Sequence, residues 1–129
     1  MKKSLLAALT ALALATPAIA DDIAGVYKGT IFSGGDYPGT TIFTISEMGK
    51  IEGTYLYESD TGPAAGDLTD CVIEVRLLNC IWRDDFGKGD FSALFSADFK
   101  SFDGGWWEDV SPKGRFSFDG SYPWTGKRP

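Results

Sequence analysis

Polar and apolar residues alternate with a period of two over much of the chain, which is typical of strands that bury one face. In residues 91–100, Phe or Ala at every second position alternates with Ser, Leu, Asp or Lys. Residues 51–58 alternate in the same way and place Tyr55 and Tyr57 on the face expected to point inward. Both segments are therefore predicted to be half-buried strands.

Shorter runs of the same kind predict further strands at residues 23–32, 40–46, 102–110, 115–118 and 122–126. Residues 47–50 are predicted to be a hairpin connection. The segment SFDGGWW that begins at Ser101 is echoed by SFDGSYPW from Ser117. The repeat is interpreted as turn chemistry, because Asp-Gly tolerates positive φ. Turns are accordingly predicted at residues 87–89, 103–104 and 119–120.

The predicted strands follow one another in sequence order with tight turns between them, and no helix of useful length is expected among them. An antiparallel meander of about eight strands loses its open edges when it closes into a barrel. The predicted fold class is all-β: a single antiparallel meander β-barrel of about eight strands with one disulfide, formed by residues 21–129.

The N-terminal segment, residues 1–20, has the pattern of a cleaved signal peptide. Lys2 and Lys3 precede a Leu/Ala run at residues 5–15, and small residues follow that run. The run is shorter than the roughly 20 residues that a transmembrane helix needs. The mature chain is therefore expected to begin at Asp21 and to be periplasmic or secreted, with no membrane insertion.

The charge of the chain restricts its partners. The chain has 12 basic and 18 acidic residues and a formal net charge of −6. Loss of Lys2 and Lys3 with the signal peptide leaves 10 basic against 18 acidic residues, a net charge of −8. Nucleic-acid binders need clustered Lys and Arg to displace counterions from phosphates. No nucleic-acid partner is expected.

The two cysteines, Cys71 and Cys80, lie in a chain that is expected to be exported, and they predict a disulfide. A connection at residues 74–77 sets them opposite each other on paired strands, within the span of a disulfide. A tight turn at Leu78-Asn79 would instead separate them along the strand. The first hairpin is predicted, although Val75 is a poor turn residue.

Residues 25–31 (GVYKGTI) and 40–55 (TTIFTISEMGKIEGTY) resemble the opening strands of the avidin and lipocalin superfamily, the calycins. In that family a G-x-W motif precedes a G-T-Y turn and strand, and here Tyr27 replaces the tryptophan. The resemblance implies that a basic residue near the C-terminus packs on this aromatic ring. Arg128 would then close one end of the barrel by a cation–π contact; the alternative is that Arg128 binds an anionic ligand. From Cys71 onward the chain resembles small exported bacterial proteins, a resemblance that implies no activity.

The residue inventory argues against catalysis. The chain has no histidine, which excludes Ser-His-Asp and Cys-His sites and the common zinc sites. The cysteines are expected to be oxidised, which removes a thiolate nucleophile. A catalytic pair of carboxylates, as in glycosidases, needs a deep cleft for which a small barrel has little room. The chain is therefore not expected to be an enzyme or to carry a cofactor.

Asp84, Asp85 and Asp90 flank the predicted turn at residues 87–89 and offer oxygen ligands of the kind that bind calcium. Their spacing does not match an EF-hand loop, and Lys88 would place a positive charge at the centre of the site. These aspartates are interpreted as residues of a solvated turn, and no metal site is expected.

Aromatic residues are the candidates for ligand binding. Adjacent Trp106 and Trp107 would face opposite sides of a regular strand, so one of them is expected to be exposed and able to stack on a sugar or anchor a protein partner. The alternative is that the tryptophans seal the barrel rims. Tyr55 and Tyr57 would suit a small ligand with polar groups, unless phenylalanines fill the interior. The candidate ligand-binding residues are Tyr55, Tyr57, Trp82, Trp106 and Trp107.

The sequence thus predicts an exported, non-catalytic binding module that takes a small molecule or a carbohydrate, most simply inside the barrel. The alternative is a surface interaction protein, either a carbohydrate binder or an enzyme inhibitor, that uses exposed aromatic residues. A pocket of several hundred Å³ would favour the first function. A filled core with a flat aromatic patch would favour the second.

Overall fold

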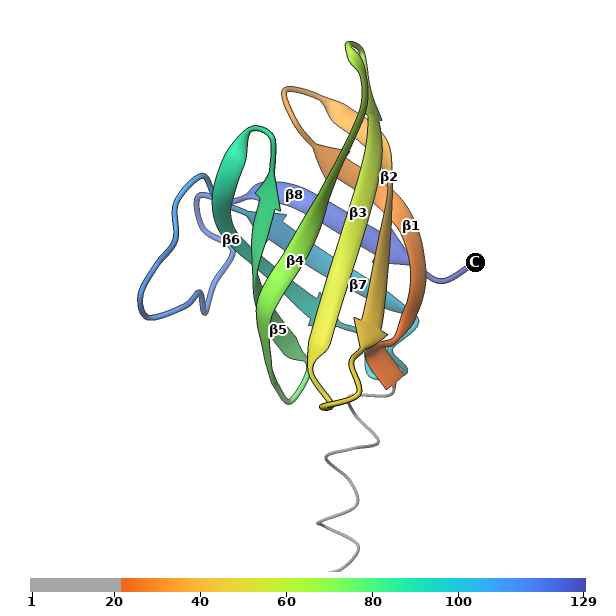
Figure 1. Cartoon of the computed structure of the whole chain (residues 1–129), viewed down its shortest axis with the longest axis vertical. Helices are drawn as coiled ribbons and strands as arrows, with labels where there is room; N and C mark the ends of the chain where they lie inside the picture. The colour runs from red at the N-terminus through yellow and green to blue at the C-terminus, as the bar shows by residue number, and fades with distance from the viewer. Residues whose placement is uncertain (1–21) are drawn as a thin grey trace, which may run out of the picture.

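The computed structural model describes residues 22–129, which form a closed barrel of eight antiparallel strands (Figure 1). The strands are β1 (Gly25–Phe32), β2 (Asp36–Ile45), β3 (Ile51–Ser59), β4 (Gly62–Glu74), β5 (Leu77–Asp84), β6 (Gly87–Phe95), β7 (Ser101–Trp106) and β8 (Tyr122–Lys127). Neighbours in sequence are neighbours in the barrel, and β8 pairs with β1 to close it. The predicted meander barrel with one disulfide is confirmed. The expected signal peptide, residues 1–20, lies outside the described residues.

Because successive strands run in opposite directions, their connections gather at two ends of the barrel. One end carries the connections β1–β2, β3–β4, β5–β6 and β7–β8, and we call it the open end. Its first three connections lie at the top of Figure 1, and the long β7–β8 connection lies at the left. The other end carries the connections β2–β3, β4–β5 and β6–β7, and we call it the plugged end. No helix within residues 22–129 has both the length and the apolar character needed to cross a membrane.

Aromatic rings fill the half of the barrel next to the plugged end. Phe43, Phe91, Phe95 and Tyr27 are each no more than 1% exposed. The Phe43 ring centroid lies 5.8 Å from that of Tyr27 and 5.8 Å from that of Phe95, both in edge-to-face geometry. Such contacts add to the free energy gained by burying the rings. The interior predicted from the alternation is therefore a packed core in this half.

Arg128 closes the plugged end in the way that the resemblance to calycins implies. Its guanidinium carbon lies 4.7 Å from the centroid of the Tyr27 ring. The same guanidinium donates hydrogen bonds to the carbonyl oxygens of Phe99 at 2.9 Å, Ala24 at 3.0 Å and Asp22. Each nitrogen of the guanidinium thus donates to a backbone carbonyl oxygen, which gives Arg128 a structural role.

Cys71 and Cys80 form a disulfide between β4 and β5, as predicted. The connection between these strands is only Val75-Arg76, which is tighter than the four-residue connection expected from the sequence. Val75 adopts a φ of 59°, which is unusual for a β-branched residue. The disulfide and the pairing of the two strands outweigh the poor turn propensity of this valine.

Several strand bounds differ from the prediction: β2 begins at Asp36 rather than at residue 40, and two strands end early. β6 ends at Phe95 rather than at residue 100, because the chain turns back there: the Ser96 amide donates to the Ser101 carbonyl oxygen at 2.9 Å. β7 ends at Trp106 rather than at residue 110. Past the strand ends the alternation no longer indicates burial, since Ala97, which the pattern places on the inward face, is exposed.

The strand predicted at residues 115–118 is wrong, since these residues belong to the long connection between β7 and β8. Side-chain contacts hold this connection in place of strand pairing. The Arg115 guanidinium pairs with the carboxylates of Asp90 and Asp109, each at 2.8 Å. The predicted turn at residues 119–120 is confirmed, with Gly120 at a φ of 74°.

The turn predicted at residues 103–104 is wrong, because both residues lie within β7. A Cβ atom at Gly104 would lie 2.6 Å from the Ser92 carbonyl oxygen and 2.9 Å from that of Trp124. The glycine is thus needed for the close approach of β7 to its neighbours. The turn predicted at residues 87–89 is also displaced, since β6 begins at Gly87 and the connection is Asp85-Phe86.

Candidate functional site

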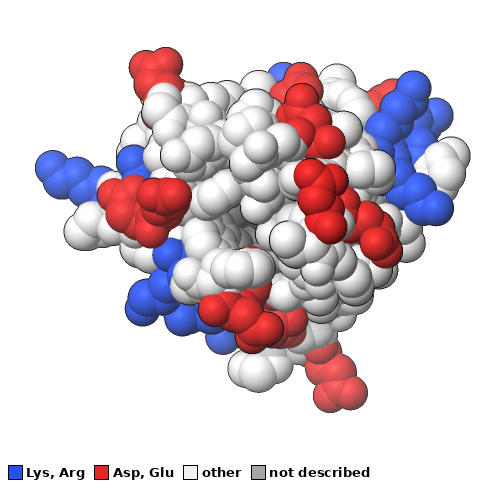
Figure 2. Space-filling model, turned by 90° about the horizontal axis from the view of Figure 1, so that it is seen from above, with Lys and Arg blue, Asp and Glu red and all other residues white. Residues whose placement is uncertain are grey.

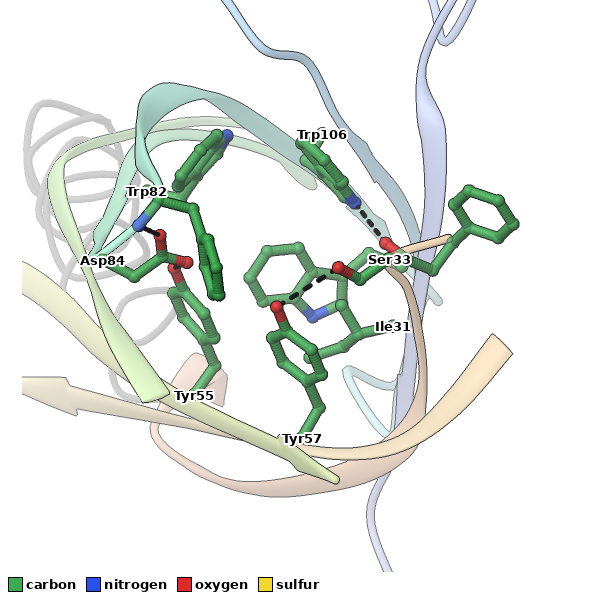
Figure 3. Close-up of a pocket in the computed structure, with 10 residues that line it drawn as sticks. Ile31, Ser33, Tyr55, Tyr57, Trp82, Asp84 and Trp106 are labelled. Atoms are coloured by element: carbon green, nitrogen blue, oxygen red, sulfur yellow. Dashed lines mark hydrogen bonds between the residues drawn. The ribbon is translucent and has the colours of Figure 1, made fainter. Parts of the chain in front are cut away.

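A small cup lies at the open end of the barrel, between the strand ends and above the packed aromatic core (Figure 3). Its lining residues come from five strands and two connections: Ile31, Phe32, Ser33, Tyr55, Tyr57, Trp82, Asp84, Phe86, Trp106 and Trp124. The cup gives water-sized molecules about 60 Å³ of space, which is room for a few waters or a group of similar size. It is smaller than the several hundred Å³ expected of an internal binding cavity.

Trp124 on β8 forms the floor of the cup. Its indole nitrogen donates to the Thr41 hydroxyl at 2.9 Å. Its ring meets those of Tyr55 and Phe91 in edge-to-face geometry, at centroid distances of 4.8 Å and 4.5 Å. A buried indole with a satisfied donor is a rigid base. It separates the cup from the packed half of the barrel.

Tyr55 and Asp84 form a hydrogen-bonded pair on one wall (Figure 3). The tyrosine hydroxyl donates to Oδ2 of Asp84 at 2.7 Å, and Oδ1 accepts from the amide of Phe86 at 2.8 Å. Burial, together with the hydrogen bond to the Asp84 carboxylate, raises the pKa of Tyr55 above its ordinary value. Tyr55 is therefore a neutral donor at physiological pH, and it holds the carboxylate against the wall.

Two further hydrogen bonds join cup side chains to the end of β1 and to the connection that follows it. The Tyr57 hydroxyl donates to the Ser33 hydroxyl oxygen at 3.3 Å. The Trp106 indole nitrogen donates to the carbonyl oxygen of Phe32 at 2.8 Å. Both bonds join the walls of the cup across different strands, so the positions of these rings are fixed before any ligand arrives.

Trp82 completes the aromatic wall. Its indole nitrogen donates to the Trp107 carbonyl oxygen at 2.8 Å. A Cβ atom at residue 89 would collide with that same carbonyl oxygen and lie 2.7 Å from the Trp82 indole nitrogen, so Gly89 makes room for the bond. Every ring N–H group in the cup lining therefore already has a protein acceptor.

The positions of Trp106 and Trp107 differ from the expectation that one would be exposed. Trp107 is buried, and it lies beyond the end of β7, where the argument from a regular strand no longer holds. Its indole nitrogen donates to the Asp119 carbonyl oxygen at 3.2 Å, and the Arg115 guanidinium lies 4.6 Å from its ring centroid. Trp106 is half-buried in the cup wall. Trp107 is not among the residues that line the cup.

The three aspartates considered as calcium ligands point to different partners. Asp84 accepts from Tyr55, whereas Asp90 pairs with Arg115. Asp85 is exposed on the β5–β6 connection. Within residues 22–129, no group of three or more His, Cys, Asp or Glu side chains could hold a metal ion.

Four of the predicted ligand-binding residues line the cup: Tyr55, Tyr57, Trp82 and Trp106. Asp84, Phe86 and Ser33 also line the cup but were not among the predicted ligand-binding residues; the aspartate was interpreted as part of a solvated turn. One signal could have found Asp84. It lies two positions after Trp82, and residues two apart on a strand share a face. The other two residues lie in connections, where alternation carries no information.

Acidic side chains surround the mouth of the cup. Figure 2 looks onto the open end, where acidic groups lie on several sides of a central hollow and most basic groups lie nearer the outline. Exposed aspartates mark the connections around the mouth: Asp36 at the start of β2, Asp60 between β3 and β4, and Asp85 between β5 and β6. None of these three connections contains a lysine or an arginine.

Comparisons with protein-family models, with curated proteins and with solved structures give no match for the chain. The eight-stranded antiparallel barrel is compatible with a calycin-like fold. The cup and its rim are therefore the features from which a function has to be derived.

Proposed function

We propose that this chain is an exported, non-catalytic binding protein of the calycin type that takes a small ligand in the cup at its open end. The observation that carries the proposal is the composition of the cup. Five Tyr and Trp side chains and one carboxylate converge there, whereas mainly phenylalanine rings fill the other half of the interior. A concave apolar surface with a few fixed polar groups is the usual form of a small-molecule site.

The order of the cup supports binding without rearrangement. Tyr55, Tyr57 and Trp82 are each no more than 7% exposed, and each donates a hydrogen bond to another part of the barrel. A site that is already ordered spends little conformational entropy on binding. Phe86 is the exception at the mouth, where its side chain is 78% exposed. A ligand in the cup would cover part of this ring.

The absence of catalysis is supported by the chemistry of the side chains. The chain has no histidine, and both cysteines are bonded to each other. Asp84 is the only carboxylate among the residues that line the cup. Hydrolysis of a glycoside by paired carboxylates would require a second one within reach of the same ligand. Binding is the simpler role for such a lining.

The proposed location rests on the N-terminal segment and the disulfide. Residues 1–20 have the pattern of a signal peptide. The bond between Cys71 and Cys80 is the kind that forms and persists in the periplasm or outside the cell.

A second candidate function is surface interaction through exposed aromatic residues. Phe116, on the long β7–β8 connection, is 76% exposed. An exposed ring on a connection held by ion pairs could stack on a sugar or anchor a partner protein. This candidate uses Phe116 instead of Trp106 or Trp107, which the barrel covers in part or entirely.

The two candidates are separated by a thermal-shift screen of small molecules and oligosaccharides, followed by two variants. Tyr55→Phe with Tyr57→Phe keeps the ring volume and removes the hydroxyl groups of the cup. Phe116→Ala changes the surface connection alone. If the cup is the site, hits weaken in the tyrosine variant by roughly 0.5 to 1.5 kcal/mol for each hydrogen bond lost, and they bind normally to Phe116→Ala.

Hits that ignore the tyrosines and require Phe116 would establish the surface function instead. Titration of wild-type tryptophan fluorescence gives an independent readout, because Trp82, Trp106 and Trp124 all line the cup. A hit that stabilises the protein without changing this fluorescence would speak against binding in the cup.

A further inference from the structure

We infer that the ligand of the cup is a small organic cation, an amine or quaternary ammonium group, for which Asp84 supplies the counter-charge. This inference rests on the proposed function, because it names the ligand class for the same cup. It is carried by three features of the open end: an unpaired carboxylate, donors that are already occupied, and an aromatic wall.

The carboxylate of Asp84 has no basic partner. The ion pairs among residues 22–129 join Arg83 to Asp70 and Arg115 to both Asp90 and Asp109. Asp84 receives only two neutral donors, the Tyr55 hydroxyl and the Phe86 amide. It is also the only charged residue in the cup lining. A carboxylate in a partly apolar cup is stabilised when a cation joins it.

The donors of the cup argue against an anionic ligand. The three indole nitrogens of the lining donate to a carbonyl or hydroxyl oxygen of the protein, and both tyrosine hydroxyls donate to side chains. A carboxylate or phosphate ligand would find few free N–H or O–H groups and would face the like charge of Asp84. A cationic ligand needs no free N–H or O–H group from the cup and is attracted by the charge of Asp84.

The aromatic wall suits a cation that is alkylated or otherwise weakly hydrated. Tyr55, Tyr57, Trp82 and Trp106 line the cup together. The faces of such rings attract ammonium groups, and the attraction increases where water is excluded. The space of about 60 Å³ limits the buried part to a head group. The rest of a longer ligand would lie over the mouth, beside the exposed Phe86 ring.

The acidic rim adds a long-range preference of the same sign. Asp36 begins β2, and Asp60 and Asp85 lie on the β3–β4 and β5–β6 connections; basic residues at this end of the barrel are found on the longer β7–β8 connection, at Lys113 and Arg115. A concave site surrounded by one sign of charge raises the local concentration of counter-ions and speeds their association. Cations are therefore favoured before they reach Asp84.

The test compares three probes of nearly the same shape: choline, the uncharged alcohol in which carbon replaces the choline nitrogen, and the anion pivalate. Binding to the mature protein is measured by isothermal titration calorimetry and by tryptophan fluorescence, at low and high salt. Choline is expected to bind at least ~10-fold more tightly than its carbon analogue. Pivalate is expected to bind more weakly than both.

Two variants locate the effect. Asp84→Asn removes the charge and keeps one of the two oxygen acceptors that Tyr55 and Phe86 use. It is expected to weaken choline binding ~10-fold or more while sparing the carbon analogue. Asp103→Asn removes the same charge from an exposed position on β7 outside the cup. It is expected to leave both affinities within about twofold of the wild type.

The wild type alone provides a test that does not depend on the folding of a variant. Choline affinity is expected to fall as salt rises, whereas the affinity of the carbon analogue does not. Equal binding of the charged and uncharged probes, or choline binding that Asp84→Asn leaves unchanged, would overturn the inference.

If only uncharged or anionic compounds bind, and the tyrosine variant weakens them, the cup is a binding site and the cation assignment is wrong. If no probe binds at millimolar concentration, the cation assignment is also wrong. The wider screen and its fluorescence readout then decide separately whether the cup binds any ligand at all.

Discussion

The plugged end and the open end of the barrel each place a charged side chain beside a tyrosine, and they differ in what satisfies the charge. At the plugged end, Arg128 lies over the Tyr27 ring and donates to three backbone carbonyl oxygens. At the open end, Asp84 accepts from Tyr55 and one amide and has no cation beside it. A charge satisfied by the chain seals the barrel, whereas a charge left without a counter-ion faces the solvent and any ligand.

The aromatic residues at the two ends also differ in whether they carry polar atoms. Phe43, Phe91 and Phe95 have no polar atoms, so they can be enclosed without further partners. Tyr55 and Tyr57 need a partner for each hydroxyl group, and they find it near the mouth. The Tyr27 hydroxyl at the plugged end is instead satisfied by backbone carbonyl oxygens, so the two ends differ in whether side chains or the backbone satisfy the tyrosines.

The largest expected contrast between the ends comes from removing a ring. Phe43→Ala is expected to lower the free energy of unfolding by about 3 to 5 kcal/mol, because it opens a cavity in the packed half. Phe86→Ala at the exposed mouth is expected to change it by less than about 0.5 kcal/mol. Urea denaturation of the two variants measures both values. Similar losses would mean that the packed half and the mouth do not differ as described.

The disulfide of the β4–β5 hairpin is expected to give the next largest effect. Cys71→Ala with Cys80→Ala should lower the free energy of unfolding by roughly 2.5 to 3 kcal/mol, because the loop in the unfolded chain is no longer closed. Non-reducing mass spectrometry of the exported wild type should show one intramolecular bond. Two free thiols or a covalent dimer would contradict the hairpin geometry.

Arg128→Ala is expected to destabilise the protein by about 2 kcal/mol, since it removes hydrogen bonds from a charged donor and a cation–π contact. Arg128→Lys should recover only part of this loss, because an ammonium group cannot reproduce the planar fork of donors. Ligand affinity per folded molecule, measured by calorimetry, should not change. A specific loss of affinity for anions in these variants would revive the alternative that Arg128 binds a ligand.

The last effect is absent at neutral pH and tests the tyrosines at both ends. Burial raises the pKa of Tyr27 and of Tyr55, and the hydrogen bond to Asp84 raises that of Tyr55 further. Both groups then hold their protons more tightly in the folded state than in the unfolded chain. Their contribution to stability is complete below about pH 10, the pKa of an unperturbed tyrosine, and it declines above it.

The decline should reach about 1.4 kcal/mol per pH unit for each tyrosine that stays neutral in the folded protein. Denaturation between neutral and strongly alkaline pH measures this slope. Tyr55→Phe should make the slope shallower, because phenylalanine does not titrate. A slope that this variant leaves unchanged would show that Tyr55 ionises in the folded state as readily as in the unfolded chain.

Much of the barrel could be predicted because alternation is a local property of each strand. Most of β4 escaped prediction, since it contains two each of Gly, Ala and Asp and its apolar residues alternate weakly. Its residues form a strand because β3 and β5 offer hydrogen-bond partners on both sides. Conversely, residues 115–118 resemble a strand and form none, because Arg115 is drawn to Asp90 and Asp109.

The candidate site was likewise predictable only in part. Tyr55, Tyr57 and Trp82 could be selected from the sequence because they are aromatic residues on inward faces. The contact between Asp84 and Tyr55 could not be predicted in this way. It depends on the register of β3 with β4 and of β4 with β5. Trp107 was selected for its residue type, and the end of β7 then placed it outside the cup lining.

The sequence by itself determined the fold class, the pairing of Cys71 with Cys80 and the inward tyrosines, because period-two alternation, turn spacing and cysteine reach act over a few residues. Only the tertiary structure decided which end is sealed and which residues share the cup. Barrel closure sets contacts such as that between Trp106 and Phe32, which are far apart in the chain. Such contacts depend on the register of every strand pair around the barrel, which the alternation within a single strand does not determine.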